Sequence, residues 1–387
     1  MRPVYISGIG STPFGRHRDM SIESLATQAS HQAIKESGLA REQLGALYLG
    51  NFISGPLNGK EVLAGIVADR LGMPGNIPCT KVEGACASGG IAFRHAWLAV
   101  AYGMCDAALV VGVEKMTHAT TAEVTSALNC AMDNELDGPN GLTFPGLYGL
   151  AWRAYDQTYG LTRDEVSSVV IKNKRHGLLN PLAQMSGHLS FDEIAASAMI
   201  ADPLQLFDCC PATDGAAALV LCSEAMYRES RKQPVRVLAS VQTSGAPQIA
   251  KHLDLCTFEA TVSAAQQAYA SAKIGASQID VVELHDCFSM AEIIDSEDLG
   301  LVPRGQGAKW AAEGRTDIGG DVAINPSGGL LAKGHPVGAT GVAQIYEVVR
   351  QLRGEHDNQV AGARIGLTHN LGGTGVACTV NILRAEQ

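Results

Sequence analysis

The sequence has little positive charge, few aromatic residues and no paired cysteine motif. Its 29 Lys and Arg residues are outnumbered by 39 Asp and Glu residues, which gives a formal net charge of −10. Such a chain lacks the basic field that attracts nucleic acid or anionic membranes, so we expect neither as a partner. Aromatic residues make up only 5%, whereas hydrophobic residues make up 46% and charged ones 18%. This balance excludes a disordered chain and predicts a large buried core.

Targeting and membrane signals are also missing. No apolar run approaches the roughly eighteen residues of a membrane-spanning helix. The first ten residues have the pattern of a strand and turn rather than of a signal peptide, and the final Arg-Ala-Glu-Gln387 is not a peroxisomal tripeptide. None of the ten cysteines stands in a C-x-x-C pair. We therefore expect a cytoplasmic protein with reduced thiols and no membrane insertion.

What the sequence does contain is glycine and alternating strand-like and helix-like segments. The 387 residues include 43 glycines, which suit tight turns between strands and helices. Strands are predicted at Val4–Ile6, Ala46–Leu49, Ala107–Val113, Ala216–Cys222, Val235–Gln242, Val281–Leu284, Ile365–Thr368 and Ala377–Ile382. Helical spacing lies between them at Ile22–Ser37, Ala87–Ala101, Val262–Lys273 and Val342–Leu352. The alternation predicts an α/β fold with a mainly parallel, helix-covered sheet.

The two sets of strands look like copies of one unit. A shift of 235 residues aligns a helix, a short connection and a strand in both sets. Aligned pairs include Ala29 with Ala264, Gln32 with Gln267 and Leu49 with Leu284. We predict two similar halves related by a pseudo-twofold axis, one formed by residues 1–117 and 214–234 and the other by residues 235–387.

Residues 118–213 fit neither copy and are too long for a plain connection. We expect this segment to fold as an excursion over the functional site, with one clear helix near Thr162–His176. That helix ends Lys172-Asn-Lys-Arg-His-Gly177. These basic residues fit either an ordinary helix C-terminus with glycine after it, or a patch for the phosphates of a bound nucleotide.

Cys86 is the first candidate for chemistry. It lies in Val82-Glu-Gly-Ala-Cys-Ala-Ser-Gly-Gly90, and helical spacing follows. A strand, a small-residue turn and a helix would put the sulfur at a helix N-terminus, where the pKa of a thiol is expected to fall. The residue would then be a nucleophile. The alternative is a buried small hydrophobic residue, as most free cysteines are.

His335 lies at the equivalent place in the second copy. The loop Asn325-Pro-Ser-Gly-Gly-Leu-Leu-Ala-Lys-Gly-His-Pro-Val-Gly-Ala-Thr-Gly341 is rich in glycine and opens a helix. A twofold axis would bring the two helix starts together, so that an imidazole meets the Cys86 thiol and can activate it. The alternative is a histidine that only hydrogen-bonds to backbone.

A second histidine follows a predicted strand directly, in His285-Asp-Cys-Phe-Ser289. Active sites of α/β proteins form at the carboxyl ends of such strands. His285 could donate a hydrogen bond to an oxyanion, and Cys287 could carry a proton. A metal site is disfavoured, because the sequence shows no complementary set of ligands.

The last glycine-rich turn is His369-Asn-Leu-Gly-Gly-Thr-Gly375, between two predicted strands. Its backbone N–H groups could form an oxyanion hole, although a plain hairpin turn explains the pattern equally well. No Walker loop is present, and Gly8-Ile-Gly10 lacks the third glycine of a dinucleotide-binding motif.

Taken together, these motifs resemble the thiolase family along nearly the whole chain. The resemblance rests on the turn around Cys86, the Gly-His335-Pro loop and the glycine tail, together with Val113-Glu-Lys-Met and Asp214-Gly-Ala-Ala-Ala. The block His285-Asp-Cys-Phe is similar to that of sterol-carrier-protein-type and archaeal-bacterial thiolases, whereas other thiolases carry Asn-Glu-Ala/Gly-Phe there.

The resemblance implies a five-layer α-β-α-β-α fold in which residues 118–213 cover coenzyme A. It implies a thiolase that forms or cleaves 3-ketoacyl-CoA, for example from two acetyl-CoA to acetoacetyl-CoA and CoA. On this account Cys86 carries the acyl group and His335 removes its proton. His335 and His285 hold the enolate oxygen, and the backbone N–H groups of Cys86 and Leu371 hold the second oxyanion. The family likeness also implies a homodimer or homotetramer with no metal and no cofactor beyond its CoA thioester substrates.

One position departs from the family pattern. Many thiolases have an acid/base cysteine at the start of the glycine tail, where this chain has His369. The subgroup likeness suggests that Cys287 supplies the thiol instead, and His369 would assist it, replace it or only pack. The segment Asp208-Cys-Cys-Pro211 loosely resembles a part of the family's pantetheine channel.

Two other functions remain open. The chain could transfer an acyl group to a non-CoA acceptor, or act as a retro-aldolase, together with an OB-fold partner protein. The presence of Cys86 argues against the retro-aldolases, which look to have lost it. The last alternative is a non-catalytic scaffold that binds acyl-CoA.

Overall fold

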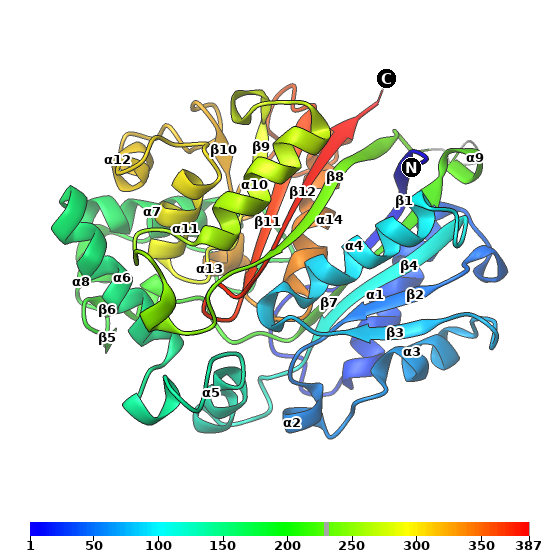
Figure 1. The fold of residues 1–387 in the computed structure, drawn as a ribbon, viewed down its shortest axis with the longest axis horizontal. Coiled ribbons are helices and arrows are strands. Elements are labelled where there is room, and N and C mark those ends of the chain that lie inside the picture. Colours follow the sequence, from blue (N-terminus) through cyan, green and yellow to red (C-terminus); the bar gives the residue numbers. More distant parts are fainter. Residues whose placement is uncertain (228–231, 387) are drawn as a thin grey trace.

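The computed structural model describes residues 1–227 and 232–386. Its main feature is a ten-stranded sheet with the order β10-β9-β11-β12-β8-β1-β7-β4-β2-β3 (Figure 1). The strands are β1 (Val4–Ser11), β2 (Leu47–Gly50), β3 (Cys79–Val82), β4 (Ala107–Glu114), β7 (Gly215–Ser223), β8 (Val235–Ser244), β9 (Val281–Glu283), β10 (Ala323–Ile324), β11 (Ile365–Gly372) and β12 (Ala377–Ala385).

The strand order has the predicted twofold character. Read outward from the centre, β8-β12-β11-β9-β10 repeats the order β1-β7-β4-β2-β3 of the first half. The halves join through a short antiparallel pairing of β1 with β8, in which Tyr5 faces Arg236 and Ile6 faces Val235. Two similar α/β halves are thus confirmed. The exact domain limits stay a prediction, and residues 228–231 of the segment 214–234 lie outside the described residues.

The prediction of a mainly parallel sheet is wrong. Only the outer pairings, β9 with β10 and β11 and β2 with β3 and β4, run parallel. The central pairings are antiparallel, because β12 returns from β11 through a short turn and β7 returns beside β4 after the long excursion. A tight turn can only join antiparallel neighbours. Alternation of strands and helices does not reveal such returns.

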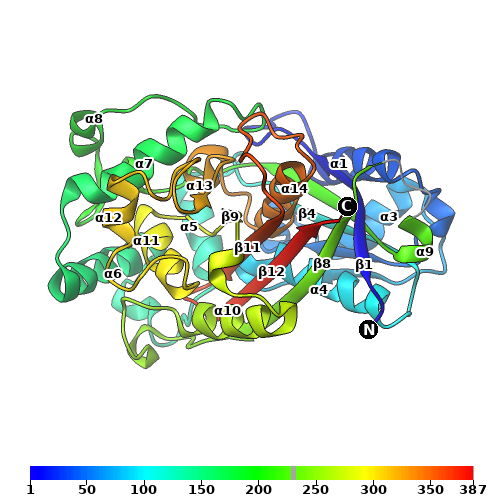
Figure 2. The same ribbon diagram turned by 90° about the horizontal axis from the view of Figure 1, so that it is seen from above.

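Helices cover both faces of each half. The main ones are α1 (Ile22–Ser37), α3 (Leu63–Leu71), α4 (Ser88–Ala101), α10 (Glu259–Ala272), α11 (Ser289–Asp298) and α14 (Thr340–Leu352), with the shorter α2 (Ser54–Asn58), α9 (Glu224–Tyr227), α12 (Gly307–Ala312) and α13 (Gly329–Lys333). Helices α4 and α14 contact each other and strands of both halves, whereas α1 and α3 lie outside the first half and α10 outside the second (Figure 2). The order of layers is therefore α-β-α-β-α.

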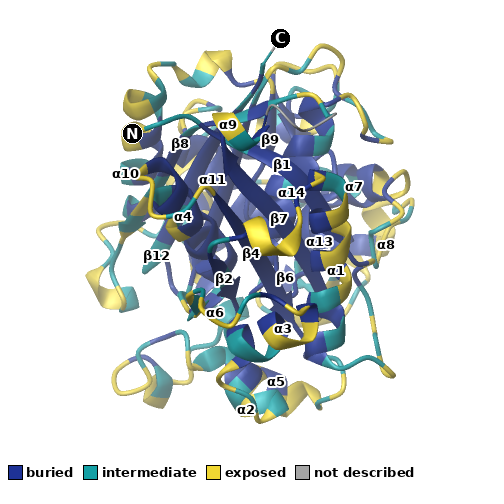
Figure 3. Ribbon diagram, turned by 90° about the vertical axis from the view of Figure 1, so that its right-hand side faces the viewer, coloured by how far each residue is buried: buried dark blue, intermediate teal, exposed yellow. Residues whose placement is uncertain are grey.

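The strands are apolar on both faces because each face is covered. In β4, Leu109, Val111 and Val113 face the core formed with α1 and α3, while Ala108 and Val110 face the core formed with α4 and α14. All five are fully buried, and Figure 3 shows buried strands inside with exposed residues on the outer helices. Burial of each large aliphatic side chain contributes about 1.5–3 kcal/mol.

The excursion contains more structure than the sequence predicts. It holds α5 (Thr121–Asn129), α6 (Phe144–Tyr159), α7 (Arg163–Gly177), α8 (Phe191–Ala195) and a small hairpin of β5 (Met199–Ala201) and β6 (Leu204–Gln205). Only α7 is predicted. Helix α6 begins where the Thr143 hydroxyl accepts the Gly146 N–H, just ahead of an aromatic and glycine-rich run that hides helical spacing. Among the described residues, no helix is long and apolar enough to cross a membrane.

Candidate active site

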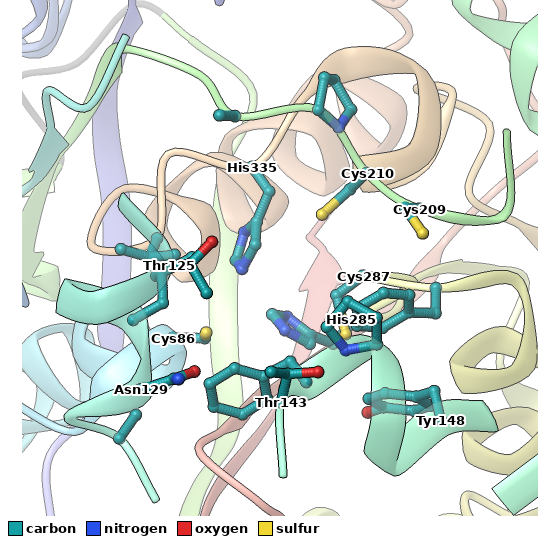
Figure 4. Close-up of a pocket in the computed structure, with 18 of the residues that line it drawn as sticks. Cys86, Thr125, Asn129, Thr143, Tyr148, Cys209, Cys210, His285, Cys287 and His335 are labelled. Carbon is teal, nitrogen blue, oxygen red and sulfur yellow. The ribbon is translucent and has the colours of Figure 1, made fainter. Parts of the chain in front are cut away.

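A cavity of about 240 Å³ opens where loops of the two halves and the excursion meet. Its lining includes Cys86, His285, Cys287, His335 and Leu371, which come from separate parts of the chain (Figure 4). The Sγ of Cys86 and a ring nitrogen of each of the two histidines lie within 4.8 Å of one another. The structure therefore gathers the four predicted catalytic side chains and the predicted oxyanion residue at one place.

The turn that carries Cys86 is held under strain between β3 and α4. Ala85 has a φ of +51°, a left-handed conformation that costs a non-glycine residue about 1–3 kcal/mol. The Ser88 hydroxyl pins the turn, since it accepts the Gly84 N–H at 3.0 Å and donates to the Ala85 carbonyl at 2.6 Å. From the other half, Gly372 approaches so closely that a Cβ there would lie 2.3 Å from the Gly84 oxygen. The sulfur is thus fixed by both halves of the molecule.

The Cys86 thiol does not have the lowered pKa that its helix-start position predicts. Burial raises its pKa to about 12, and the Glu114 carboxylate acts in the same direction. The N–H of Gly373 and its own N–H hydrogen-bond to the sulfur and lower the pKa, but by less than burial raises it. The resting residue is a neutral thiol, so it needs a base to become a nucleophile.

The geometry of His335 fits such a base. Its Nδ1 lies 2.7 Å from the Thr340 hydroxyl, which itself donates to the Pro336 carbonyl at 3.3 Å. The hydroxyl must therefore accept from Nδ1–H, which leaves the lone pair on Nε2. That nitrogen is buried without a partner, and the ring points toward Cys86 in Figure 4. Burial lowers the pKa of His335 to about 3, so the imidazole is neutral.

His285 is arranged in the opposite way. Its Nδ1 lies 3.1 Å from the amide Nδ2 of Asn370, a donor, so the ring proton is on Nε2. The rings of His285 and His335 stand edge to face with centroids 4.9 Å apart. Burial and the neighbouring imidazoles of His335 and His369 hold the pKa of His285 well below its usual value. The site thus contains one neutral imidazole with a free lone pair and one with a free N–H, so the first can accept a proton and the second can donate a hydrogen bond.

Cys287 lines the same cavity. Its carbonyl accepts the Cys210 N–H at 3.0 Å, and its thiol hydrogen-bonds to the Tyr148 hydroxyl. Burial, with Cys210 and Cys86 nearby, raises the pKa of Cys287 well above its usual value. The residue is a protonated thiol and can serve as an acid.

His369 does not line the cavity. It is completely buried, and its Nδ1 accepts the backbone N–H of His285 at 3.4 Å. Its Nε2 lies 3.0 Å from the Thr261 hydroxyl, which donates to Asp295. The sequence left three roles open for His369: to assist Cys287, to replace it, or only to pack. The contacts fit a packing role, in which His369 holds the backbone of His285.

The basic end of α7 does not form a phosphate patch. Lys172, Lys174 and His176 are buried and bind protein groups, including the carbonyls of Ile324, Leu331 and Asn325 respectively. Arg175 is exposed but pairs with Asp317. The phosphate interpretation is therefore wrong, because these cations point into the protein rather than toward solvent.

The same cluster of Cys86, His285 and His335 is the group of described residues whose spacing could hold a metal ion. Zinc takes such donors, but as thiolate and imidazole lone pairs. Here His285 presents an N–H to the cavity and Cys86 is a neutral thiol. These protonation states fit acyl transfer, and the absence of a metal stays a prediction.

Several residues that shape the site are missed by the sequence reasoning. Thr340 and Asn370 stand inside quoted motifs, but nothing in one sequence shows that they set the histidine tautomers. Gly373 belongs to the predicted glycine turn, although the sequence points to Leu371 instead. Tyr148 has no sequence signal at all, because it comes from α6 of the excursion.

Comparisons with known proteins agree with this geometry. Residues 4–225 match the family model "Thiolase, N-terminal domain" and residues 242–385 match "Thiolase C-terminal domain-like". The chain is 44% identical over 383 residues to the acetyl-CoA acetyltransferase of Methanothermobacter thermautotrophicus, covering 99% of both chains. It is 37% identical over 380 residues to the benzoylsuccinyl-CoA thiolase subunit BbsB of Thauera aromatica, covering 96% of this chain and 95% of the relative.

A solved structure extends the comparison. The Ltp2-ChsH2(DUF35) aldolase matches with a TM-score of 0.86 at 26% identity, covering 100% of this chain and 98% of the other. Matched family models span almost the whole described chain, and the strand order, the layers and the cavity are consistent with them. The chain belongs to the thiolase family.

Proposed function

We propose that this protein is a CoA-dependent acyltransferase that forms or cleaves 3-ketoacyl-CoA through an acyl group carried on Cys86. The arrangement of Cys86, His335 and His285 within 4.8 Å at one cavity carries the proposal. The 44% identity to an acetyl-CoA acetyltransferase favours acetyl-CoA as the acyl donor and acetoacetyl-CoA as the product.

In the first step the Nε2 of His335 takes the Cys86 proton as the sulfur attacks the thioester. The backbone N–H groups beside the sulfur hold the oxyanion, each with a typical worth of about 3–4 kcal/mol. Cys287 gives its proton to the departing CoA sulfur. The products are acyl-Cys86, free CoA, a protonated His335 and a Cys287 thiolate, so the charges balance.

In the second step the Cys287 thiolate takes the α-proton of another acetyl-CoA. The enolate oxygen accepts hydrogen bonds from His285 and the protonated His335, and the enolate carbon attacks acyl-Cys86. The N–H groups of Cys86 and Leu371 would hold the resulting oxyanion. Release of the product returns the His335 proton to Cys86, and thiolysis follows the same path backward.

The first test is intact mass after incubation with acetyl-CoA or acetoacetyl-CoA. The wild-type protein should gain one acetyl group, and Cys86→Ala should gain none. Cys105→Ala, which changes a half-buried cysteine away from the cavity, is the matched control and should acylate like wild type. No adduct from either donor would contradict the proposal.

We also propose a second candidate, in which the chain transfers its acyl group to a non-CoA acceptor, or cleaves an aldol product, together with an OB-fold partner. It is supported by the match to a structure described as the Ltp2-ChsH2(DUF35) aldolase and by a relative described as a subunit. Thiolysis of acetoacetyl-CoA by the isolated chain would favour the first candidate. An acyl-enzyme that forms without any turnover would favour the second candidate. Binding of acyl-CoA with neither an acyl-enzyme nor turnover would indicate a non-catalytic scaffold.

We further propose a cytoplasmic homodimer or homotetramer of lipid metabolism that uses CoA thioesters and no other cofactor. Residues 118–213 would cover the bound CoA, which is supported by Thr125, Asn129, Thr143 and Tyr148 of that segment lining the cavity. Light scattering of the purified protein tests the assembly, and a monomer mass would contradict it.

A further inference from the structure

A buried polar cluster behind the cavity is not used by the reaction. Helix α7 contributes Lys172, Asn173 and Lys174, the loop after β9 contributes Asp286, and α11 contributes Glu292; each is almost fully buried. The ammonium of Lys172 lies 3.0 Å from the Glu292 carboxylate. The cluster thus contains two carboxyl groups and two amino groups, of which Lys172 and Glu292 form an ion pair. None of the five lines the cavity.

Asp286 is the member that reaches the catalytic loops. It stands between His285 and Cys287 in the chain, yet its carboxylate points away from the cavity. One oxygen accepts the N–H of Leu330 at 2.7 Å. The other accepts the N–H of Leu331 at 3.3 Å and the amide of Asn173 at 2.8 Å. Both oxygens are therefore committed to protein donors.

The helix whose N–H groups bind Asp286 is α13, and the proposed base His335 follows it closely in the chain. Leu330 and Leu331 belong to α13, and His335 follows two residues after α13 ends. At the other side of this helix, the buried Lys174 ammonium donates to the Leu331 carbonyl at 2.6 Å. The contact between Asp286 and the start of α13 is close enough to require glycine at position 329, because a Cβ on Gly329 would lie 2.2 Å from the Asp286 carboxylate.

We propose that Asp286, braced by Asn173 of α7, is a positioning residue that ties the His285–Cys287 loop to α13 and so holds the free Nε2 of His335 against Cys86. This inference rests on the proposed roles of Cys86 and His335. Besides covering bound CoA, residues 118–213 would then help to position the catalytic residues, because α7 supplies both Asn173 and Lys174 to the place where the His285–Cys287 loop meets α13. The basic end of α7 thereby acts on the catalytic geometry rather than on a phosphate.

The physical reason is that Asp286 holds the start of α13. The end of the helix is tied separately, by the N–H groups of Gln184 and Met185 on the carbonyls of Lys333 and Ala332 and by the Lys333–Glu347 ion pair. Helix α13 spans five residues, so it cannot hold its place by its own hydrogen bonds alone. A carboxylate on its first free N–H groups and an ammonium on a carbonyl complement the helix dipole and fix its ends. Loss of the carboxylate leaves buried N–H groups unpaired, and α13 shifts together with His335.

The test measures the reactivity of Cys86 without any CoA substrate. Iodoacetamide alkylation of Cys86 is followed by peptide mass at pH 7 in wild type, Asp286→Asn, His335→Ala and the double variant. Since displacement by about 1 Å can cost 100-fold, we expect Asp286→Asn to slow alkylation roughly 100-fold. The double variant should lose little more than His335→Ala, because both changes remove the same base.

The control is Asp298→Asn, which removes another buried carboxylate that bonds Thr257, Phe258 and Arg304 away from α13. It should alkylate like wild type. If Asp286→Asn does not fold, Asn173→Ala takes its place with an expected loss of roughly 10-fold. A folded variant with normal alkylation, or losses that multiply in the double variant, would overturn the proposal. Because no acyl donor is used, a wrong substrate assignment would not affect this result.

Discussion

At the scale of single residues, the site depends on two neutral imidazoles in opposite tautomers. Thr340 places the proton of His335 on Nδ1, and Asn370 leaves the proton of His285 on Nε2. The sequence predicts both histidines, because each stands in a loop at the end of a strand or the start of a helix. It cannot predict their tautomers, since these depend on partners that only the folded chain brings near.

The pH dependence of Cys86 alkylation tests which group activates the thiol. The pKa of His335 is lowered to about 3 and that of Cys86 is raised to about 12. In wild type the base is therefore available from about pH 4 upward, so the rate should vary little between pH 5 and about 9. In His335→Ala only the thiolate reacts, and the rate should rise about tenfold per pH unit. A tenfold rise per unit in wild type would show that His335 is not the base.

Removing the hydroxyl that orients His335 should cost activity without removing the base. In Thr340→Val the buried Nδ1–H loses its acceptor at a cost of about 1–3 kcal/mol, which favours a proton on Nε2. Acylation of Cys86 should then slow by roughly 10–100-fold, as for other groups that orient a histidine. Thr340→Ser keeps the hydroxyl and should retain most of the rate. Equal rates for the two variants, measured by quenched intact mass, would contradict this role.

At the scale of elements, the turn around Cys86 was predictable in outline but not in detail. The sequence indicates a strand, a small-residue turn and a helix, and the structure has β3, the turn and α4. The left-handed Ala85 and the contact with Gly372 depend on the second half of the molecule. The sequence predicts a lowered pKa for the Cys86 thiol and is wrong, because burial of the thiol in the folded chain raises its pKa more than the nearby backbone N–H groups lower it.

The close approach of Gly372 to the turn gives an element-scale prediction. In Gly372→Ala the new Cβ would lie 2.3 Å from the Gly84 oxygen, so the turn must move. We expect a loss of about 1–3 kcal/mol in stability together with slower acylation of Cys86. Gly187→Ala, where a Cβ would meet nothing within 4 Å, is the control. Thermal unfolding and acylation rates measured on both variants check this, and a normal Gly372→Ala would show that the turn can yield.

The elements that the sequence misses have local reasons. Strand β10 has only two residues, and the strands β5 and β6 of the excursion have three and two. Helices α5 and α8 are short and largely exposed, so they lack a long apolar stripe. Periodicity detects elements that bury a continuous face, and these do not.

At the scale of the whole molecule, the active site lies on the pseudo-twofold axis. The starts of α4 and α14 meet there, and a Cβ on Gly341 would lie 2.4 Å from the Gly90 nitrogen. The sequence repeat predicts this meeting of helix starts, because equivalent glycine-rich turns occur in both halves. The antiparallel centre of the sheet was not predictable in the same way, since strand direction depends on how the connections return.

The buried histidines couple this site to the stability of the entire chain. His285, His335 and His369 are neutral in the fold, with pKa values held below the ordinary value of about 6.5 by burial. At these three positions the unfolded chain binds more protons than the folded chain below pH 6.5, so the histidines make the fold less stable as the pH falls. Glu114 and Glu283 act oppositely between pH 7 and 4.5, because burial raises their pKa to about 7.

A single substitution tests how much one of these histidines contributes to the pH dependence of stability. His369→Gln leaves the cavity lining intact and removes a group whose pKa is lowered to about 3. Below pH 6 its free energy of unfolding should fall less steeply than that of wild type, by about 1.4 kcal/mol per pH unit. Urea unfolding between pH 4.5 and 7 measures both slopes, and a difference between variants is more reliable than either total. Parallel slopes would mean that His369 is protonated in the folded protein, paired with the nearby Asp295, and that it does not oppose folding in acid.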